Sequence, residues 1–303
     1  MALENLAGKS IAGYRLLNRV GEGGTAEVYR AEHPARGASA FKVLRERLRS
    51  DPIVVKRFLR EAGYGSRVVH PGVVRTYDFG EADGLYYLAL EWAKGEPLAD
   101  FLHRDGPLAP ADAVALTCQL ADALAAAHQA GIIHRDLKPE NIMYDPESRT
   151  VKLLDFGIAR DAEQVEERLT RTGFFVGTLQ YVAPEALSGE LVDGRADIYS
   201  LAKILYYMLT GRHPHEGRSP RELFQELLSG KPIPLSKASE DLTFAPALEA
   251  VVMKGLERHP GERQQTVTEF AEELETALAE SKDEPKRGWL GALKNMVNKR
   301  SSE

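Results

Sequence analysis

The chain lacks the features that mark extracellular and membrane-spanning proteins. It has 303 residues and a single cysteine, Cys118, so no disulfide can form within it. No apolar run approaches the roughly 18 residues that a spanning helix needs, and no signal peptide, repeat or low-complexity block is evident. We therefore expect a cytoplasmic protein, with Cys118 as a small buried hydrophobic residue rather than a reactive thiol.

The chain also lacks an excess of positive charge. Lysine and arginine total 39 against 45 for aspartate and glutamate, which gives a net charge of −6. This balance does not suggest nucleic acid as a partner. With 43% hydrophobic and 28% charged residues, the composition is that of an ordinary soluble protein with an ample core.

Two parts of different character follow one another along the chain. From about residue 14 to residue 90 the pattern is mostly short strand-like runs, interrupted by one helix over 52–67. From about residue 107 helical patterns dominate, and we expect helices over 109–131, 197–211, 219–230 and 266–280. The sequence therefore predicts a small sheet-rich lobe joined near 91–96 to a larger helical lobe. Clefts between such lobes favour ligands.

A glycine cluster, GEGGTAEV at 21–28, lies between two strand-like runs and opens no helix. It therefore fits neither a dinucleotide fingerprint nor a Walker loop. Glycines at a hairpin tip let backbone N–H groups approach phosphate oxygens closely. A plain flexible hairpin explains the cluster equally well when it is considered alone.

A lysine and a glutamate in the first part also point to a site. Lys42 interrupts the apolar strand pattern SAFKVL. Glu61 falls on the face of the helix 52–67 that is expected to pack inward, where an unpaired charge is unfavourable. We hypothesise that Lys42 and Glu61 form an ion pair.

The segment IIHRDLKPENIMY at 132–144 places charged groups between apolar flanks. If the strand at 141–144 pairs with the strand at 151–154, the hairpin returns Asp155 to the side of Asn141. Amide and carboxylate oxygens suit Mg²⁺, which binds phosphate oxygens. Asp136, just upstream, can accept a proton or orient a hydroxyl, and Lys138 can neutralise charge on a transferring group.

These motifs occur in the order of the established protein-kinase signature. The glycine loop, strand lysine and helix glutamate are followed by HRDLKPEN at 134–141, DFG at 155–157 and VAPEAL at 182–187. Over about 14–278 the chain resembles a bacterial eukaryotic-like Ser/Thr protein kinase. The resemblance implies an α+β, two-lobed protein-kinase-like fold, with an antiparallel small-lobe sheet and one key helix. The implied kinase domain is 14–280, with its small lobe over about 14–92 and its large lobe over about 93–280, between an N-terminal extension 1–13 and a tail 281–303.

The resemblance assigns roles to particular residues. Asp136 would orient and deprotonate the acceptor hydroxyl, with Lys138 near the transferring phosphoryl group. Asn141 and Asp155 would hold Mg²⁺, with Mn²⁺ as an alternative. ATP would be bound by the glycine loop, the strand lysine and its partner, and the residues at the join: Val20, Gly21, Glu22, Gly23, Gly24, Thr25, Ala26, Val28, Ala40, Lys42, Glu61, Leu90, Glu91 and Ala93.

One of these residues departs from the family pattern. Ala26 stands where the third glycine of the glycine loop is expected. One methyl group can stiffen the loop, but the backbone donors remain, so we expect ATP binding to persist. His134 is expected to be a buried structural imidazole rather than a catalyst, because the family uses the aspartate as the base.

The resemblance also implies the reaction and its control. Lys138, two residues after Asp136, is typical of Ser/Thr kinases, so the acceptors would be Ser or Thr hydroxyls of proteins. Thr170 and Thr172 are candidates for autophosphorylation, and Arg135 could pair with the phosphate. Structural roles fall on Asp197 and on an expected Arg263–Glu185 pair. A pseudokinase scaffold and a small-molecule phosphotransferase are the alternatives.

The tail differs from the body of the chain. Six lysines and arginines against three acidic residues give 281–303 a charge of 6 − 3 = +3, and its apolar residues follow a short amphipathic helix. Three interpretations stay open: docking of the tail on the large lobe, a frayed chain end, and peripheral contact of 286–300 with an anionic membrane. Gly63 and Gly65 weaken the helix that carries Glu61, and a second copy of the chain could stabilise it as a homodimer.

Overall fold

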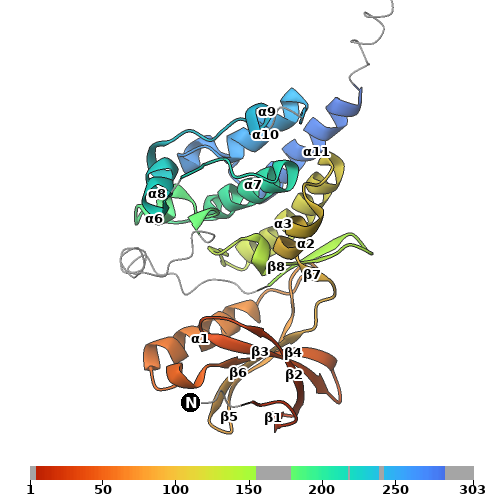
Figure 1. The fold of residues 1–303 in the computed structure, drawn as a ribbon, viewed down its shortest axis with the longest axis vertical. Helices are drawn as coiled ribbons and strands as arrows, with labels where there is room; N and C mark the ends of the chain where they lie inside the picture. Colours follow the sequence, from red (N-terminus) through yellow and green to blue (C-terminus); the bar gives the residue numbers. More distant parts are fainter. Residues whose placement is uncertain (1–4, 155–178, 218, 239–241, 284–303) are drawn as a thin grey trace, which may run out of the picture.

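The computed structural model describes residues 5–154, 179–217, 219–238 and 242–283. The chain forms a small lobe and a larger helical lobe, which Figure 1 shows at the bottom and the top of the view. This two-lobed α+β arrangement confirms the predicted fold class. No helix within the described ranges is both long and apolar enough to cross a membrane.

The small lobe is built on a six-stranded antiparallel sheet. In spatial order its strands are β1 (Ser10–Ile11), β2 (Tyr14–Glu22), β3 (Ala26–His33), β4 (Gly37–Leu44), β6 (Leu85–Glu91) and β5 (Thr76–Ala82). The five longer strands correspond to the predicted runs. Leu6 and Ile11, from the predicted extension 1–13, are each 2% exposed and pack in the same core as Tyr14 and Phe41.

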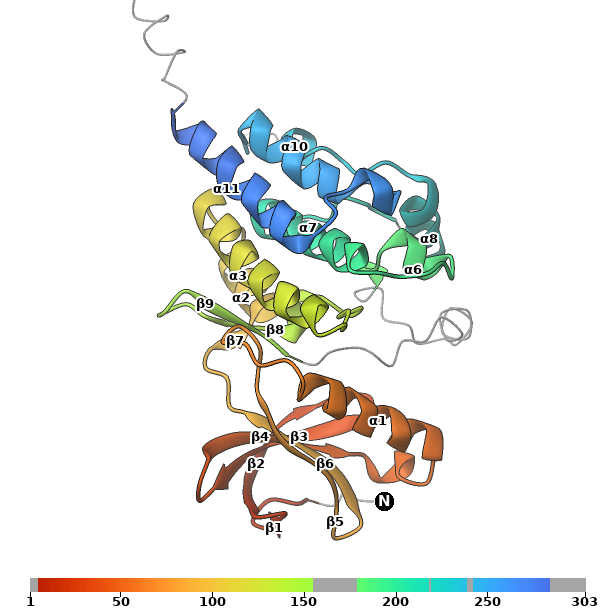
Figure 2. The same ribbon diagram turned by 180° about the vertical axis from the view of Figure 1, so that it is seen from behind.

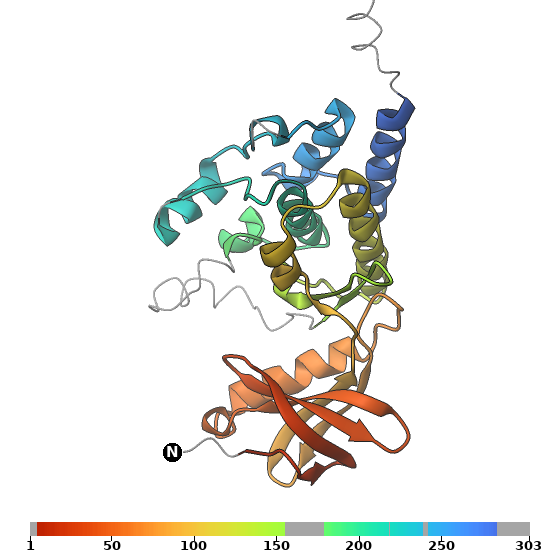
Figure 3. The same cartoon turned by 45° about the vertical axis from the view of Figure 1, so that its right-hand side comes forward.

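Helix α1 (Pro52–Gly65) packs along one face of this sheet, as Figure 3 shows. It begins where the sequence predicts, because the Asp51 side chain accepts hydrogen bonds from the N–H groups of Ile53 and Val54 and proline fills the first turn. Phe58 and Ala62 form its buried face. The helix ends two residues before the predicted boundary.

The large lobe contains the helices α2 (Leu98–Asp105), α3 (Pro110–Gln129), α6 (Pro184–Leu187), α7 (Arg195–Thr210), α8 (Pro220–Ser229), α9 (Leu235–Ala238), α10 (Pro246–Gly255) and α11 (Val267–Asp283). Figure 2 shows α7 enclosed among the others. Four of these helices match the predicted ranges, whereas α2, α6, α9 and α10 were not predicted. Each of these four has ten residues or fewer, which leaves little apolar periodicity to detect.

A three-stranded sheet lies where the lobes meet. Its strands are β7 (Glu96–Pro97), β8 (Ile142–Asp145) and β9 (Thr150–Leu153), in that order. In the β8–β9 hairpin Ile142 lies opposite Leu153, which confirms the predicted pairing of 141–144 with 151–154. Leu153 also bonds to the small-lobe chain, since it donates to Gly72 O over 2.8 Å and accepts from Val74 N over 2.9 Å.

Short 3-10 turns complete the fold at η1 (Glu46–Leu48), η2 (Pro139–Asn141) and η3 (Pro260–Glu262). The single cysteine, Cys118, lies on α3, where it is partly buried. Burial raises the pKa of its thiol to about 11, so little thiolate exists near neutral pH. This agrees with an unreactive structural cysteine.

Candidate active site

The glycine segment forms the tip of the β2–β3 hairpin. Gly21 lies opposite Val28, and the Gly23 N–H donates to Ala26 O over 2.9 Å. Residues 22–25 are exposed at the tip. Ala26 is only 2% exposed and packs in the core between the sheet and α1. Its methyl group therefore fills the lobe interior and leaves the backbone of the tip accessible.

Lys42 and Glu61 come from different elements but line one pocket. Phe41, its neighbour on β4, packs into the core on the face of the sheet away from α1. Because side chains alternate along a strand, Lys42 faces α1. Glu61 on α1 is half-buried and lines the same pocket, together with Leu90 and Leu154. A direct ion pair between Lys42 and Glu61 stays a prediction.

The remaining small-lobe candidates lie on the strands that lead into the junction. Val20 is on β2 and 46% exposed, and Ala40 on β4 lies opposite Leu90 on β6. Ala93 follows two residues after the end of β6 and is half-buried. Leu90 thus belongs to the sheet and also lines the pocket that contains Lys42.

Glu91, the last residue of β6, ties the junction to both lobes. Its carboxylate accepts a hydrogen bond from Arg75 N over 3.2 Å and forms an ion pair with Lys152 on β9. Its own N–H donates to Arg75 O over 2.8 Å. Lys152 directly precedes Leu153, which bonds to the small-lobe chain. Two successive residues of β9 therefore connect the large lobe to the small lobe.

Asp136, Lys138 and Asn141 converge in the loop before β8. The Asn141 Nδ2 donates to Asp136 O over 2.9 Å and to Asp136 Oδ2 over 3.2 Å, and Lys138 Nζ lies 3.4 Å from the same Oδ2. Since the amide nitrogen is committed to Asp136, the amide oxygen of Asn141 is the atom left to ligate a cation. The Asp136 carboxylate is held in place by both neighbours.

Asp197 on α7 anchors the backbone of this loop. It is 1% exposed and accepts hydrogen bonds from His134 N over 2.9 Å, Arg135 N over 3.0 Å and His128 Nε2 over 2.8 Å. Arg135 has φ 61°, a left-handed conformation that costs a non-glycine residue about 1–2 kcal/mol. The two backbone bonds to one carboxylate offset this cost and fix the residue that precedes Asp136.

His134 is 0% exposed, and its Nδ1 accepts the Asp136 N–H over 3.3 Å. It therefore shapes the loop from inside, in agreement with the structural role expected of it. His128, which also binds Asp197, was not predicted from the sequence. Because it lies 69 positions away on a different helix, no local pattern could have linked the two residues.

Asp155, Thr170 and Thr172 lie outside the described residues, as does 284–303. The chain leading to Asp155 is described. Leu154 N donates to Asn141 O over 2.9 Å, so the hairpin returns the chain to Asn141. The residue before Asp155 is thus hydrogen-bonded to the backbone of Asn141, and the position of Asp155 itself stays a prediction.

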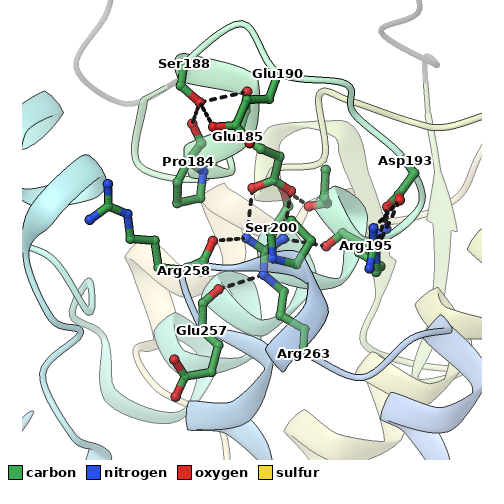
Figure 4. Close-up of polar contacts among 12 residues, drawn as sticks. Pro184, Glu185, Ser188, Glu190, Asp193, Arg195, Ser200, Glu257, Arg258 and Arg263 are labelled. Atoms are coloured by element: carbon green, nitrogen blue, oxygen red, sulfur yellow. Dashed lines mark hydrogen bonds and ion pairs between the residues drawn. The ribbon is translucent and has the colours of Figure 1, made fainter.

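The expected Arg263–Glu185 pair is present and deeply buried (Figure 4). Arg263 is 2% exposed and Glu185 is 4% exposed, and two parallel bonds of 2.7 and 2.8 Å join them. The other guanidinium donors reach the carbonyls of Arg195 at 2.9 Å, Glu257 at 2.7 Å and Arg258 at 2.9 Å. All five N–H groups of Arg263 are therefore satisfied.

This pair fixes the end of the segment 179–187 to the large lobe. Glu185 belongs to α6, whereas Arg263 directly follows η3. Ser200 on α7 also holds this segment, because its hydroxyl donates a hydrogen bond to Tyr181 O over 2.7 Å. Ser200 was not predicted from the sequence, because no feature of the neighbouring residues distinguishes it from other serines in helices.

The fold and this constellation define a protein kinase domain. The protein kinase domain model matches residues 14–274, so the chain belongs to that family. Serine/threonine-protein kinase pkn3 of Myxococcus xanthus is 39% identical over 280 residues, which covers 90% of this chain and 51% of the relative. PknB of Mycolicibacterium smegmatis is 41% identical over 266 residues, which covers 86% of this chain and 42% of the relative.

The curated relatives are Ser/Thr protein kinases by name, and this chain spans about half or less of their length. Among solved structures, the PknI kinase domain of Mycobacterium tuberculosis matches with a TM-score of 0.69 at 30% identity. The match covers 89% of this chain and 98% of the PknI chain. Rad53 1–466 in complex with AMP-PNP matches with a TM-score of 0.70 at 26% identity, over 86% and 64% of the two chains.

The buried Arg263–Glu185 pair generates a stability prediction. Arg263→Lys keeps the positive charge but cannot satisfy both carboxylate oxygens and three carbonyls. We expect it to lower the free energy of unfolding by about 3 kcal/mol, the scale for breaking a buried pair, as measured by denaturant titration. Arg195→Lys, which alters the surface pair with Asp193, is the matched control and should change it by less than about 1 kcal/mol. Equal effects from both variants would contradict the assignment.

Proposed function

We propose that this chain transfers the γ-phosphoryl group of ATP to Ser or Thr hydroxyls of protein substrates. The observation that carries the proposal is the Asp136 carboxylate, contacted by Asn141 and Lys138 in a loop that Asp197 anchors. The membership in the protein kinase family and the Ser/Thr kinase names of the relatives support it. A scaffold without chemistry would not need this arrangement.

In the proposed reaction the residues of the small lobe hold the nucleotide. The exposed N–H groups at the tip of the β2–β3 hairpin would bind phosphate oxygens. Lys42 would contact the α- and β-phosphates, with Glu61 holding its ammonium group in position. The backbone of Glu91 and Ala93 would bind adenine beside Leu90.

The large lobe supplies the acceptor side. Asp136 would accept the proton of the Ser or Thr hydroxyl as the hydroxyl oxygen attacks phosphorus. Lys138, within 3.4 Å of Asp136, would offset negative charge on the transferring group. Asn141 and Asp155 would hold Mg²⁺, or Mn²⁺ with the same oxygen ligands. When bound, the metal supplies positive charge that neutralises the phosphate oxygens.

Loss of the proposed base gives the direct test. Asp136→Asn should lower kcat by roughly 10²–10⁴-fold, the range for a lost general base, in a radiolabelled ATP assay with a Ser/Thr-containing protein. Nucleotide binding, followed by a fluorescent ATP analogue, should be retained, because Asp136 does not hold the phosphates. Asp100→Asn, at an exposed position on α2, is the control. Near-normal turnover by Asp136→Asn would contradict the role.

We also propose that Thr170 and Thr172 are autophosphorylated and that Arg135 binds the phosphate. The Nε of Arg135 is buried and makes no hydrogen bond to any residue in the described ranges, which supports an anionic partner. Incubation with ATP should add phosphate to one or both threonines, as read by intact mass and peptide mapping. Asp136→Asn should remain unmodified. An active preparation without phosphate at either threonine would disprove the proposal.

The tail gives a further proposal on partners. We propose that 286–300 contacts an anionic membrane surface through its basic and apolar residues. The full chain should co-sediment with vesicles that contain phosphatidylserine, and a chain ending at residue 285 should not. Equal sedimentation of the two chains would instead favour docking of the tail on the large lobe. Homodimer formation through the small lobe stays a hypothesis, which the mass of the free chain in solution tests.

A further inference from the structure

One face of α7 carries a lysine inside the large lobe. Lys203 is 0% exposed, and its Nζ makes no hydrogen bond to any residue that the structure describes. Tyr199, one turn earlier on α7, offers its ring to the ammonium group at 5.2 Å. The buried charges of Asp197 and Arg263 are matched by hydrogen bonds, so Lys203 is the exception in this core.

Two histidines of the loop after α7 lie in the electrostatic field of Lys203. His213 and His215 flank Pro214, and the Nδ1 atom of each is buried without a hydrogen bond to any described residue. Burial, with the charge of Lys203 as the second cause, lowers the pKa of His213 to about 4 and that of His215 to about 3. Lys203 Nζ and the Nδ1 atoms of both histidines are thus buried nitrogens that lack a hydrogen bond to any described residue.

The charges around this region do not neutralise it. The guanidinium of Arg263 also contacts the Tyr199 ring, 4.8 Å from its centroid, but the carboxylate of Glu185 matches the charge of Arg263. The carboxylates of Glu216 and Glu249 and the guanidinium of Arg212 act on the buried hydroxyl of Tyr206, on the same helix. For Lys203 itself burial is the cause of the shift, and it lowers the pKa from 10.5 to about 7.

Tyr207 lies one turn after Lys203 on α7, and through His213 it connects this face of the helix to the segment that the Arg263–Glu185 pair anchors. The ring of His213 stacks on Tyr207 at 4.8 Å and meets the edge of Tyr181 at 5.5 Å. Residue Gly217 then packs closely against Leu223 of α8, and Leu223 packs with Leu179 and Leu187. Loop 211–217 therefore lies between α7, α8 and the segment 179–187.

We propose that Lys203 forms a buried proton-binding site that controls how firmly loop 211–217 and the segment 179–187 pack on α7. A proton on Lys203 places an unmatched ammonium in the core, which is unfavourable. The loop can relieve this by moving outward, since Arg212, Glu216 and Gly217 are already exposed. The inference concerns proton binding and does not depend on phosphoryl transfer.

The sign of the pH dependence follows from the two states of the lysine. Between about pH 7 and pH 10.5 the unfolded chain carries a proton on Lys203 that the folded chain does not. Stability therefore rises with pH through this window and is lowest, for this group, below pH 7. The histidines extend the loss on the acid side, because only the unfolded chain protonates them between their ordinary pKa of 6.5 and about pH 4.

A titration of the full chain labelled with ¹³C-lysine tests the site directly by NMR. We expect one lysine Cε signal to titrate near neutral pH, while the others titrate near the ordinary value of about 10.4. That signal should disappear in Lys203→Met and persist in Lys237→Met, an exposed lysine on α9. If every lysine of the folded wild-type chain titrates above about pH 9, the proposal is overturned.

Thermal unfolding between pH 6 and pH 10 provides the second readout. Lys203→Met should raise Tm at pH 7 by about 2–5 °C, and the gap to the wild-type chain should narrow toward pH 10. Lys237→Met should follow the wild-type profile. A Tm difference between Lys203→Met and the wild-type chain that stays constant across the pH range would show a packing effect without proton binding and would refute the proposal. The absence of any Tm difference would also refute it.

A kinetic readout links the site to the segment 179–187 and rests on the proposed function. As pH falls from 8 to 6.5, the KM for a Ser/Thr peptide should rise several-fold in the wild-type chain and stay nearly constant in Lys203→Met, with the KM for ATP unaffected in both. Identical peptide profiles for the two would refute the coupling. Absence of all phosphoryl transfer would refute the proposed function, and the NMR and thermal results would still decide the proton site.

Discussion

A single carboxylate on α7 fixes the geometry on which the candidate active site depends. Asp197 accepts hydrogen bonds from His134 N, Arg135 N and His128 Nε2 inside the core. The bonds to two successive N–H groups hold Arg135 at positive φ, and that conformation directs the chain into Asp136. Because a buried charge must be matched, the loop that carries Asp136 cannot leave Asp197 without removing two of the three hydrogen bonds that this carboxylate accepts.

The consequences extend from this loop to the junction between the lobes. Asp136 binds the amide of Asn141, and Asn141 O in turn accepts the N–H of Leu154 at the end of the β8–β9 hairpin. The same hairpin bonds to the small lobe through Leu153 and to Glu91 through Lys152. One chain of contacts therefore runs from the core of the large lobe to the residues proposed to hold adenine.

Much of the fold follows from local pattern. The strands of the small lobe, the Asp51 cap of α1 and the turn between β8 and β9 all have local signals, and the structure contains each of them. Helices α2, α6, α9 and α10 escaped prediction because each has ten residues or fewer, which leaves little apolar periodicity to detect. The pairing of Arg263 with Glu185 was expected only through the resemblance to a family, since 78 positions separate them.

The sequence by itself determined the family and the two lobes, because the motifs 134–141 and 182–187 and their order can be read directly from it. It also names the residues that we propose bind a nucleotide. Tertiary structure decided what those motifs rest on. Asp197, Ser200 and Lys203 all lie on one helix within seven positions of each other, yet one anchors a loop, one holds Tyr181, and one is a buried lysine without a hydrogen bond to any described residue. The roles of Asp197 and Ser200 depend on partners distant in the sequence, and only packing brings those partners within reach.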